Sequence, residues 1–436
     1  MRRLAILCFS ACLASARLSA EPAPLPEPLS LPAALAAIPA DHPDLLAARA
    51  ERDAAAAALT RARAGDDLSV DLDLQARRIR PAHDSPDLRH DDSRAVLRAS
   101  KTLYDFGRTR QATVAGKADL AAGEARLQRA RQRLRRTVMA RFFDVLLADL
   151  AAAREEEAMS VAYVRFDRAR DRAEAGELSE VDLLALEDRY QQARLRRERA
   201  VARQRQTRAR LALALGRPNQ LPDELLPPDL PGLERPLPDF DALREQALAH
   251  SPELAALRAA LAAGQARRAA ARAQRRPTLY LQVDAAHYAR EFGARDPLTA
   301  ILGLNVPLWQ GGRVDGAVQT ADAELERLRA RLGAARQRLE QDLLAAWQDI
   351  ETLQLQRQAA ALRADYRDLY LDRSRAQYEL EIRTDLGDAM VQQSAARLYQ
   401  AETDYHLALA WERLVELTGD PAWSALNPPA AQENAP

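Results

Sequence analysis

The residues of this sequence that could bind a metal lie together in the segment HDSPDLRHDD, residues 83–92. The segment contains His83, His90 and four aspartates, and imidazole and carboxylate groups are common ligands of transition metals. The same segment is strongly hydrophilic and falls between two stretches with the alternating pattern of β-strands. A hydrophilic hairpin loop accounts for this composition more simply than a metal site does. We therefore predict a loop here and no bound metal.

No other group of residues indicates catalysis or cofactor binding. The sequence has no glycine-rich nucleotide-binding loop, and no nucleophile is accompanied by a plausible base. Both cysteines, Cys8 and Cys12, lie within the first twelve residues. We expect these to be removed, so the mature chain would have no disulfide and no thiolate ligand. The sequence predicts a protein that is not an enzyme and holds no cofactor.

The chain begins with MRRLAILCFSACLASARLSA, in which two arginines precede a short apolar run and then small residues. This layout is typical of a secretory signal peptide, which we assign to residues 1–20, with cleavage after Ala16 or Ala20. Residues 9–12 also resemble a lipoprotein cleavage box, which would leave a lipidated Cys12. No later apolar run has the length of a transmembrane helix. We expect an exported protein without a membrane-spanning helix.

The overall charge and composition exclude some classes of protein. The 63 basic and 63 acidic residues balance, whereas a general nucleic-acid-binding protein has an excess of basic residues. Aromatic residues make up 5% of the chain and glycine is scarce, so a large β-sandwich or β-propeller is not expected. The abundance of alanine, leucine, arginine and glutamate favours long helices.

The sequence contains an internal duplication. The segment 42–65 matches 251–274, and Gly107-Arg108 matches Gly312-Arg313 in a register that continues without gaps along the following helix pattern. A proline-rich connector joins the two halves and cannot be helical throughout. The predicted organisation is a signal peptide (1–20), a first repeat (21–215), the connector (216–238), a second repeat (239–419) and a C-terminal tail (420–436).

Each repeat is predicted to contain the same elements in the same order. An alanine-rich helix comes first, over about 32–64 and 239–275, followed by two runs with the period-2 alternation of strands. The four runs are 68–76, 94–104, 278–285 and 299–308. A helix pattern of roughly 65 residues follows, on the order of 100 Å long, and a second long helix returns after a break. In the second repeat Leu325, Leu332, Leu339, Ala346 and Leu353 form a coiled-coil seam.

The predicted strands require an assembly. Each has one face of Leu, Val and Ala and an opposite face of Asp, Gln, Arg, Ser and Thr. Four strands leave open edges that invite pairing with other copies, and the smallest membrane barrels need eight. An apolar outside and a polar inside would fit an outer-membrane barrel with a wet lumen. The alternative is a pair of small soluble sheets that cap a coiled coil.

The strands and long helices are joined by two similar segments, LYDFGR (103–108) and PLWQGGR (307–313). In the second, Pro307 ends the strand, Gly311 and Gly312 provide the backbone freedom to redirect the chain, and Arg313 begins the helix. In the first, Gly107 and Arg108 are expected to do the same with a single glycine. We refer to these segments as the elbows.

These features together resemble the TolC family of outer-membrane efflux and secretion channels. The resemblance rests on the H-P-x-L helix start, the two elbows, the duplicated helix–strand–strand–helix–helix order, and the motif G-x-x-S-x-x-D-L-L at residues 176–184. It covers nearly the whole mature chain. The implied fold is mainly α with a small β part. Three copies would form a helical barrel in the periplasm, topped by a twelve-stranded transmembrane β-barrel.

The resemblance also implies a function and partners. The homotrimer would conduct substrate passively from an inner-membrane transporter, through a periplasmic adaptor, across the outer membrane of a Gram-negative bacterium. Drug, metal, dye and protein exporters share this architecture, so the sequence does not identify the substrate. The competing hypothesis is a periplasmic coiled-coil structural or adaptor protein without a pore.

The tips of the two helical hairpins carry the site residues that the resemblance implies. Adaptor docking would involve Arg172, Gly176, Leu178 and Ser179. The residues that close the pore would be Asp182, Tyr378, Arg383, Asp385 and Asp388, although two possible registers at the second tip place the carboxylate pair either on the two aspartates or on Gly387 and Met390. Taken one at a time, such aspartates are equally well explained as helix caps or solvated charges. Threefold symmetry would instead gather six carboxylates into a cation-attracting ring.

Overall fold

A computed structural model describes residues 25–81, 83, 87–218, 220, 223–290, 295–380 and 385–428. The signal peptide therefore lies outside the described residues. The predicted duplication is confirmed, because the two halves contain corresponding elements in the same order. The first half has α1 (Leu31–Ala36), α2 (Pro43–Arg63), β1 (Ser69–Gln75), β2 (Arg94–Tyr104), α3 (Arg108–Glu174) and α4 (Glu180–Ala214). The second has α5 (Phe240–His250), α6 (Pro252–Ala273), β3 (Thr278–Tyr288), β4 (Leu298–Asn305), α7 (Arg313–Glu379) and α8 (Leu386–Thr418).

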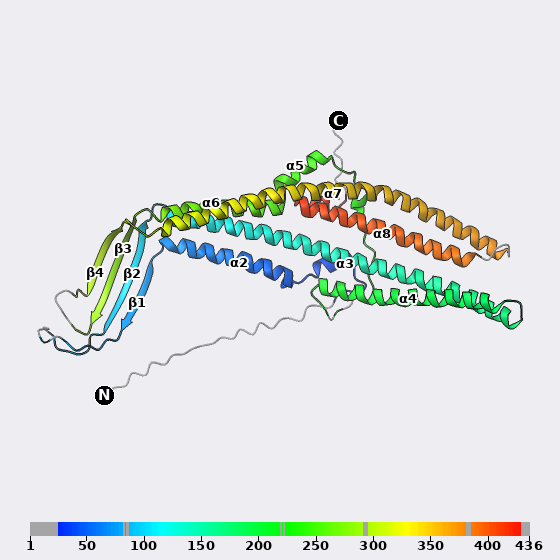
Figure 1. The fold of residues 1–436 in the computed structure, drawn as a ribbon, viewed down its shortest axis with the longest axis horizontal. Coiled ribbons are helices and arrows are strands. Elements are labelled where there is room, and N and C mark those ends of the chain that lie inside the picture. Colours follow the sequence, from blue (N-terminus) through cyan, green and yellow to red (C-terminus); the bar gives the residue numbers. More distant parts are fainter. Residues whose placement is uncertain are drawn as a thin grey trace.

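The molecule is long and narrow, with the sheet at one end and the tips of the two hairpins at the other (Figure 1). Helices α3 and α7 each contain 67 residues, so each extends about 100 Å. Next to the sheet, α2 packs on α3, α3 on α6, and α6 on α7. Toward the tips, α4 packs on α3 and α8 packs on both α7 and α3. The first helix of each repeat was predicted as one helix but is two, α1 with α2 and α5 with α6. The breaks occur at His42 and Ser251, each of which precedes a proline that disfavours helical backbone at the residue before it.

The four strands form one antiparallel sheet in the order β1-β2-β3-β4. Its register separates two kinds of side chain. One face carries the row Leu72, Leu97, Ala285 and Leu298, and the other the row Asp71, Arg98, Asp284 and Thr299. The apolar face is open in the single chain, since 61% of Leu72 and 68% of Leu302 are exposed. The polar face holds an ion pair between Arg98 and Asp284, with 3.1 Å between Nε and Oδ1.

The two elbows have the same backbone shape although their sequences differ. Gly311 and Gly312 have φ angles of 57° and 76°, and Phe106 and Gly107 have φ angles of 53° and 88°. Phe106 therefore adopts a left-handed conformation, which costs a non-glycine residue free energy. Asp105 supports this turn, because its carboxylate accepts hydrogen bonds from the amides of Gly107 and Thr109 and from the Thr109 hydroxyl. The second elbow begins two residues after β4 ends at Asn305.

The hydrophobic core lies where the hairpins meet the connector. Its largest buried side chains are Trp411, Phe142 and Phe143, and Phe143 stacks on Tyr405 with ring centroids 4.5 Å apart. The predicted seam is confirmed, since Leu325, Leu332, Leu339 and Ala346 are buried and Leu353 packs against the core.

The connector and the C-terminal segment close over this core. Arg235 of the connector lies against Trp411 of α8 and Trp423, with 5.4 and 5.7 Å from its guanidinium carbon to the ring centroids. The indole of Trp347 in α7 donates to the carbonyl of Pro238. These contacts attach the proline-rich segment to both α7 and α8.

Candidate functional site

The first hairpin tip is a compact turn built from local hydrogen bonds. Helix α3 ends at Glu174, and Gly176, two residues beyond it, has a left-handed conformation with a φ angle of 78°. The amide of Gly176 donates to Ala173 and that of Glu177 to Arg172, which is the Schellman arrangement. The side chain of Arg172 also lies 3.8 Å from the Glu177 carboxylate. The backbone at Arg172 and Gly176 is therefore held by the hydrogen bonds that terminate helix α3.

Ser179 and Asp182 form the cap of the returning helix α4. The amide of Asp182 donates to the Ser179 Oγ at 3.2 Å, and the Ser179 hydroxyl donates to the Asp182 carboxylate at 2.7 Å. These bonds satisfy the free end of the helix, so capping is the observed role of Asp182 within one chain. The tip also exposes two apolar side chains that were not predicted as site residues: Val181 and Leu184 are 76% and 56% exposed, while Leu178 is half-buried.

At the second tip, the predicted gate residues lie in different surroundings. Asp385 is half-buried and accepts a hydrogen bond from the Tyr370 hydroxyl at 3.3 Å. Asp388 is exposed and pairs with Arg165 of α3, with 2.6 Å between Oδ2 and the guanidinium nitrogen. Arg383 lies outside the described residues. Tyr378 is on the final turn of α7 and is partly exposed.

Near the tips, three of the contacts between α3 of the first hairpin and α8 of the second lie close together. One is the Arg165–Asp388 ion pair. The second is a hydrogen bond from the Ser394 hydroxyl to the Glu157 carboxylate. The third is a close approach at Gly387, where an added Cβ would lie 2.7 Å from a Val161 methyl group. We call this set the hairpin latch.

The hairpin latch was not predicted from the sequence. Its members on α3, residues 157, 161 and 165, are spaced four apart and so share one face of the helix. That periodicity could have indicated a contact face. It could not have identified the partner, because Arg165 and Asp388 are 223 residues apart.

A cavity of about 460 Å³ lies beside the hairpin latch. It brings together Tyr378 of α7, Met390 of α8, and Val164 and Arg165 of α3. The predicted gate residue Tyr378 therefore borders the groove between the hairpins. Among the described residues, no hydrogen bond joins Tyr378 to Asp182 of the first tip, because the Asp182 side chain bonds to Ser179.

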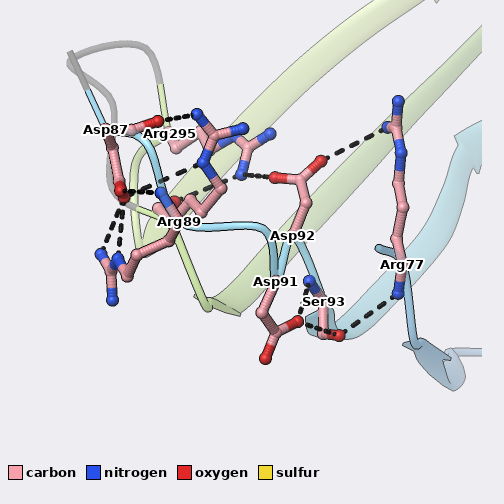
Figure 2. Close-up of polar contacts among 8 residues, drawn as sticks. Arg77, Asp87, Arg89, Asp91, Asp92, Ser93 and Arg295 are labelled. Atoms are coloured by element: carbon pink, nitrogen blue, oxygen red, sulfur yellow. Dashed lines mark hydrogen bonds and ion pairs between the residues drawn. The ribbon is translucent and has the colours of Figure 1, made fainter. Parts of the chain in front are cut away.

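The segment predicted as a loop joins β1 to β2 and is held by arginines (Figure 2). The buried Asp92 accepts a hydrogen bond from Arg295 at 2.8 Å and lies 3.5 Å from Arg77. Arg295 belongs to the segment between β3 and β4, so this contact joins the two strand connections. The hydrogen bond from Arg295 lowers the pKa of Asp92 despite its burial.

The other carboxylates of this segment have similar partners. Asp87 accepts from the backbone and side chain of Arg89, which lowers its pKa, and Asp91 accepts from the hydroxyl and amide of Ser93, with the same effect (Figure 2). In the part of the chain that the structure describes, no three His, Cys, Asp or Glu side chains are grouped so as to hold a metal. Asp92 instead joins the two strand connections through Arg295, whereas Asp91 bonds to Ser93 within its own segment.

Comparison with protein families identifies the fold. A family model described as outer membrane efflux protein matches residues 35–217 and 243–420, which together cover most of the chain and both structural repeats. The chain belongs to this family. As an outer membrane efflux protein it is a non-enzymatic channel of the outer membrane that extends into the periplasm.

Solved structures of outer-membrane channels share this fold at low sequence identity. The CmeC channel of Campylobacter jejuni is 16% identical, with a TM-score of 0.72 over 88% of this chain and 84% of that one. The MtrE channel of Neisseria gonorrhoeae, in an open state, is 18% identical, with a TM-score of 0.68 over 92% and 90% of the two chains. VceC of Vibrio cholerae is 17% identical, with a TM-score of 0.68 over 89% and 96%.

Among curated proteins, no significant match to this efflux protein is found. Within the described residues, no helix is both long enough and apolar enough to cross a membrane.

Proposed function

We propose that three copies of this chain close into one channel, which conducts substrate passively from an inner-membrane transporter and its periplasmic adaptor to the cell exterior. The observation that carries the proposal is the sheet. It has two open edges, β1 and β4, an uncovered apolar face, and a charged face on the opposite side.

The order of the elements supports a closed ring. The sheet runs β1-β2-β3-β4, and the helices beside it run α2-α3-α6-α7. The edge of one copy formed by β1 and α2 can therefore meet the edge of the next formed by β4 and α7. Because each copy has an even number of antiparallel strands, β4 of one copy and β1 of the next are also antiparallel. Such a head-to-tail contact generates a ring if the rotation closes.

The charges on the polar face favour three copies over two. Two copies would give eight strands, and the interior of an eight-stranded barrel is filled by its own side chains. Asp71, Arg98 and Asp284 would then be crowded into a dry interior, at a large desolvation cost. Twelve strands leave room for water around these side chains. The apolar face would then contact lipid.

The hairpin tips are proposed as the gate and docking region. The hairpin latch lies near the second tip and holds α3 against α8 within each chain, so releasing it would let the tip ends of α3 and α8 move apart. We propose that it works together with Tyr378, Arg383 and Asp385 to keep the resting channel closed. Arg172, Gly176, Leu178 and Ser179 form the surface of the first tip proposed to contact the adaptor, and the exposed Val181 and Leu184 extend that surface.

The proposal is tested by fractionation and bilayer recording of the purified protein. We expect it in the outer-membrane fraction as a detergent-resistant trimer that forms pores in planar bilayers. A soluble periplasmic protein without pore activity would instead support the coiled-coil adaptor hypothesis. The genes beside the coding sequence would identify the transporter and hence the class of substrate, including whether it is a drug, a metal or a secreted protein.

A further inference from the structure

Lys101 is a charged residue on the apolar face of the sheet. It is opposite Leu281, which is opposite Leu302. The neighbouring row on the same face, two residues away along each strand, consists of Ala99, Val283 and Ala300. Among the Lys, Arg, Asp and Glu side chains that the structure describes, Lys101 is the one that lies on this face of the four strands.

The Lys101 ammonium group is exposed and has no carboxylate within ion-pair distance among the described residues. Strand β2 is an inner strand of the sheet, so ring closure through β1 and β4 would not cover it with a neighbouring copy. A charge on the lipid-facing side of a barrel is costly at the bilayer midplane and tolerated near the interface. The depth of Lys101 in the bilayer therefore decides whether its charge is compatible with a position facing lipid.

The register places Lys101 close to the elbow end of the barrel. Tyr104 is opposite Leu279 and Lys101 is opposite Leu281, so they are successive outward positions, with Leu103 in the irregular step between them. Two strand residues span about 6.6 Å. Tyr104 is 57% exposed, and Trp309 at the matching position of the second elbow is 87% exposed. Such aromatic side chains lie at the interfaces of membrane barrels.

The elbows lead into the helices that extend into the periplasm, so this interface is the periplasmic one. A lysine can lay its aliphatic stem along apolar surface and extend its ammonium group toward the headgroups. Lys101 therefore lies one outward-facing position away from the exposed aromatic side chain of Tyr104. At this depth its ammonium group can reach lipid phosphates.

We propose that Lys101 binds the phosphate group of a phospholipid in the periplasmic leaflet, with its acyl chains against Leu281 and Leu302. This rests on the proposed function, because it requires the sheet to face a membrane. Each trimer would hold three such lipids at one level, one on each subunit.

The test compares lipid retention in matched variants of the full-length trimer. Vesicles of phosphatidylethanolamine and phosphatidylglycerol in phosphate-free buffer are dissolved in mild detergent, and retained phospholipids are counted by native mass spectrometry. We expect Lys101→Gln to lose one retained phospholipid per subunit and Lys101→Arg to keep it. Lys117→Gln is the control, since Lys117 is exposed on α3 and is the other lysine of the chain. Equal retention in Lys101→Gln and the unaltered trimer would overturn the proposal.

A second measurement uses the unaltered protein and decides the matter if Lys101→Gln fails to fold. With lysine side chains labelled with ¹⁵N, solid-state NMR in the same vesicles should show dipolar contact between one Nζ and lipid ³¹P. Because there are two lysines, Lys117→Gln assigns the signal. No contact in vesicles that contain conducting trimers would refute the lipid site while leaving the channel intact. Absence of membrane-embedded trimers would refute the channel and the lipid site together.

Discussion

At the scale of single residues, the Arg165–Asp388 pair is the contact whose loss should have the clearest effect on conduction. Both side chains are about half exposed, so the pair contributes roughly 0.5 kcal/mol per subunit. Three subunits give about 1.5 kcal/mol, which corresponds to roughly a tenfold shift between closed and open states. We expect Arg165→Ser with Asp388→Asn to raise the open probability of single channels in planar bilayers.

Two further variants make this prediction specific. The exchange Arg165→Asp with Asp388→Arg restores opposite charges and should return conduction toward that of the unaltered channel. Arg170→Ser is the control, because Arg170 pairs with Asp167 of its own helix. If it opened the channel as much as the latch variant does, the effect would come from general loss of charge at the tip.

Asp92 is the residue for which a pH dependence is expected. Its pKa is lowered by the hydrogen bond from Arg295, so its stabilising effect is present above the ordinary pKa of an aspartate and is lost as the pH falls through the lower, folded-state value. We expect Asp92→Asn to accelerate hydrogen exchange in the β1–β2 loop at neutral pH. At strongly acidic pH, below the folded-state pKa, the variant and the unaltered protein should exchange alike.

Asp91→Asn is the matched control for this loop. Asp91 bonds to Ser93 two residues away, whereas Asp92 joins segments 203 residues apart. Faster exchange in the Asp91 variant, equal to that of the Asp92 variant, would show that the contact between the two loops stabilises them no more than a local hydrogen bond does.

At the scale of elements, the elbows determine whether strands and helices join correctly. Replacing both Gly311 and Gly312 with Val puts β-branched residues at positive φ angles, at a cost of roughly 1–2 kcal/mol each. We expect a clear fall in the yield of folded trimer on gels, with unchanged conductance of the trimers that do form. Gly333→Ala is the control, since Gly333 lies inside α7 with open space around it, and it should keep or raise the yield.

The elbows also show how much of the fold could be predicted. The duplication, the strand alternation and the glycines of the second elbow indicated the architecture, because periodicity and backbone freedom are local properties of the sequence. The positive φ of Phe106 could not be predicted, since nothing in the sequence of a Phe indicates this conformation. It is supported by Asp105 and Thr109, whose hydrogen bonds appear only once the chain is folded.

The candidate site was less predictable than the fold. Tyr378 lies on the groove between the hairpins, Asp182 bonds within its own tip, and Asp388 pairs with Arg165. These partners depend on how two hairpins distant in sequence pack together, and no local pattern encodes that packing. The role of the tip carboxylates in an assembled ring stays a prediction.

At the scale of the whole molecule, closure of the ring can be tested with engineered cysteines. Both natural cysteines lie in residues 1–20, so the chain that we expect after removal of the signal peptide would provide a background without thiols. A Cys at Asp71 in β1, combined in turn with a Cys at successive positions of β4, should give crosslinks between copies in at least one register. We expect a ladder on denaturing gels that stops at three subunits.

Arg98→Cys with Asp284→Cys provides the control for this experiment. These residues are directly opposite one another on β2 and β3 of one chain, so their crosslink should leave a monomer. A ladder from the β1–β4 pairs that extended beyond three subunits would indicate an open filament and contradict the closed channel.

The equal length of α3 and α7 has a consequence for how this protein can change over generations. Both have 67 residues, and near the tips the two hairpins are joined by contacts between α3 and α8. Losing seven residues from one of them alone would draw one tip back by about 10 Å and separate those partners. A change in hairpin length can therefore keep these contacts only when it is made in both halves of the gene, so the two repeats are constrained to a common length even though their sequences differ.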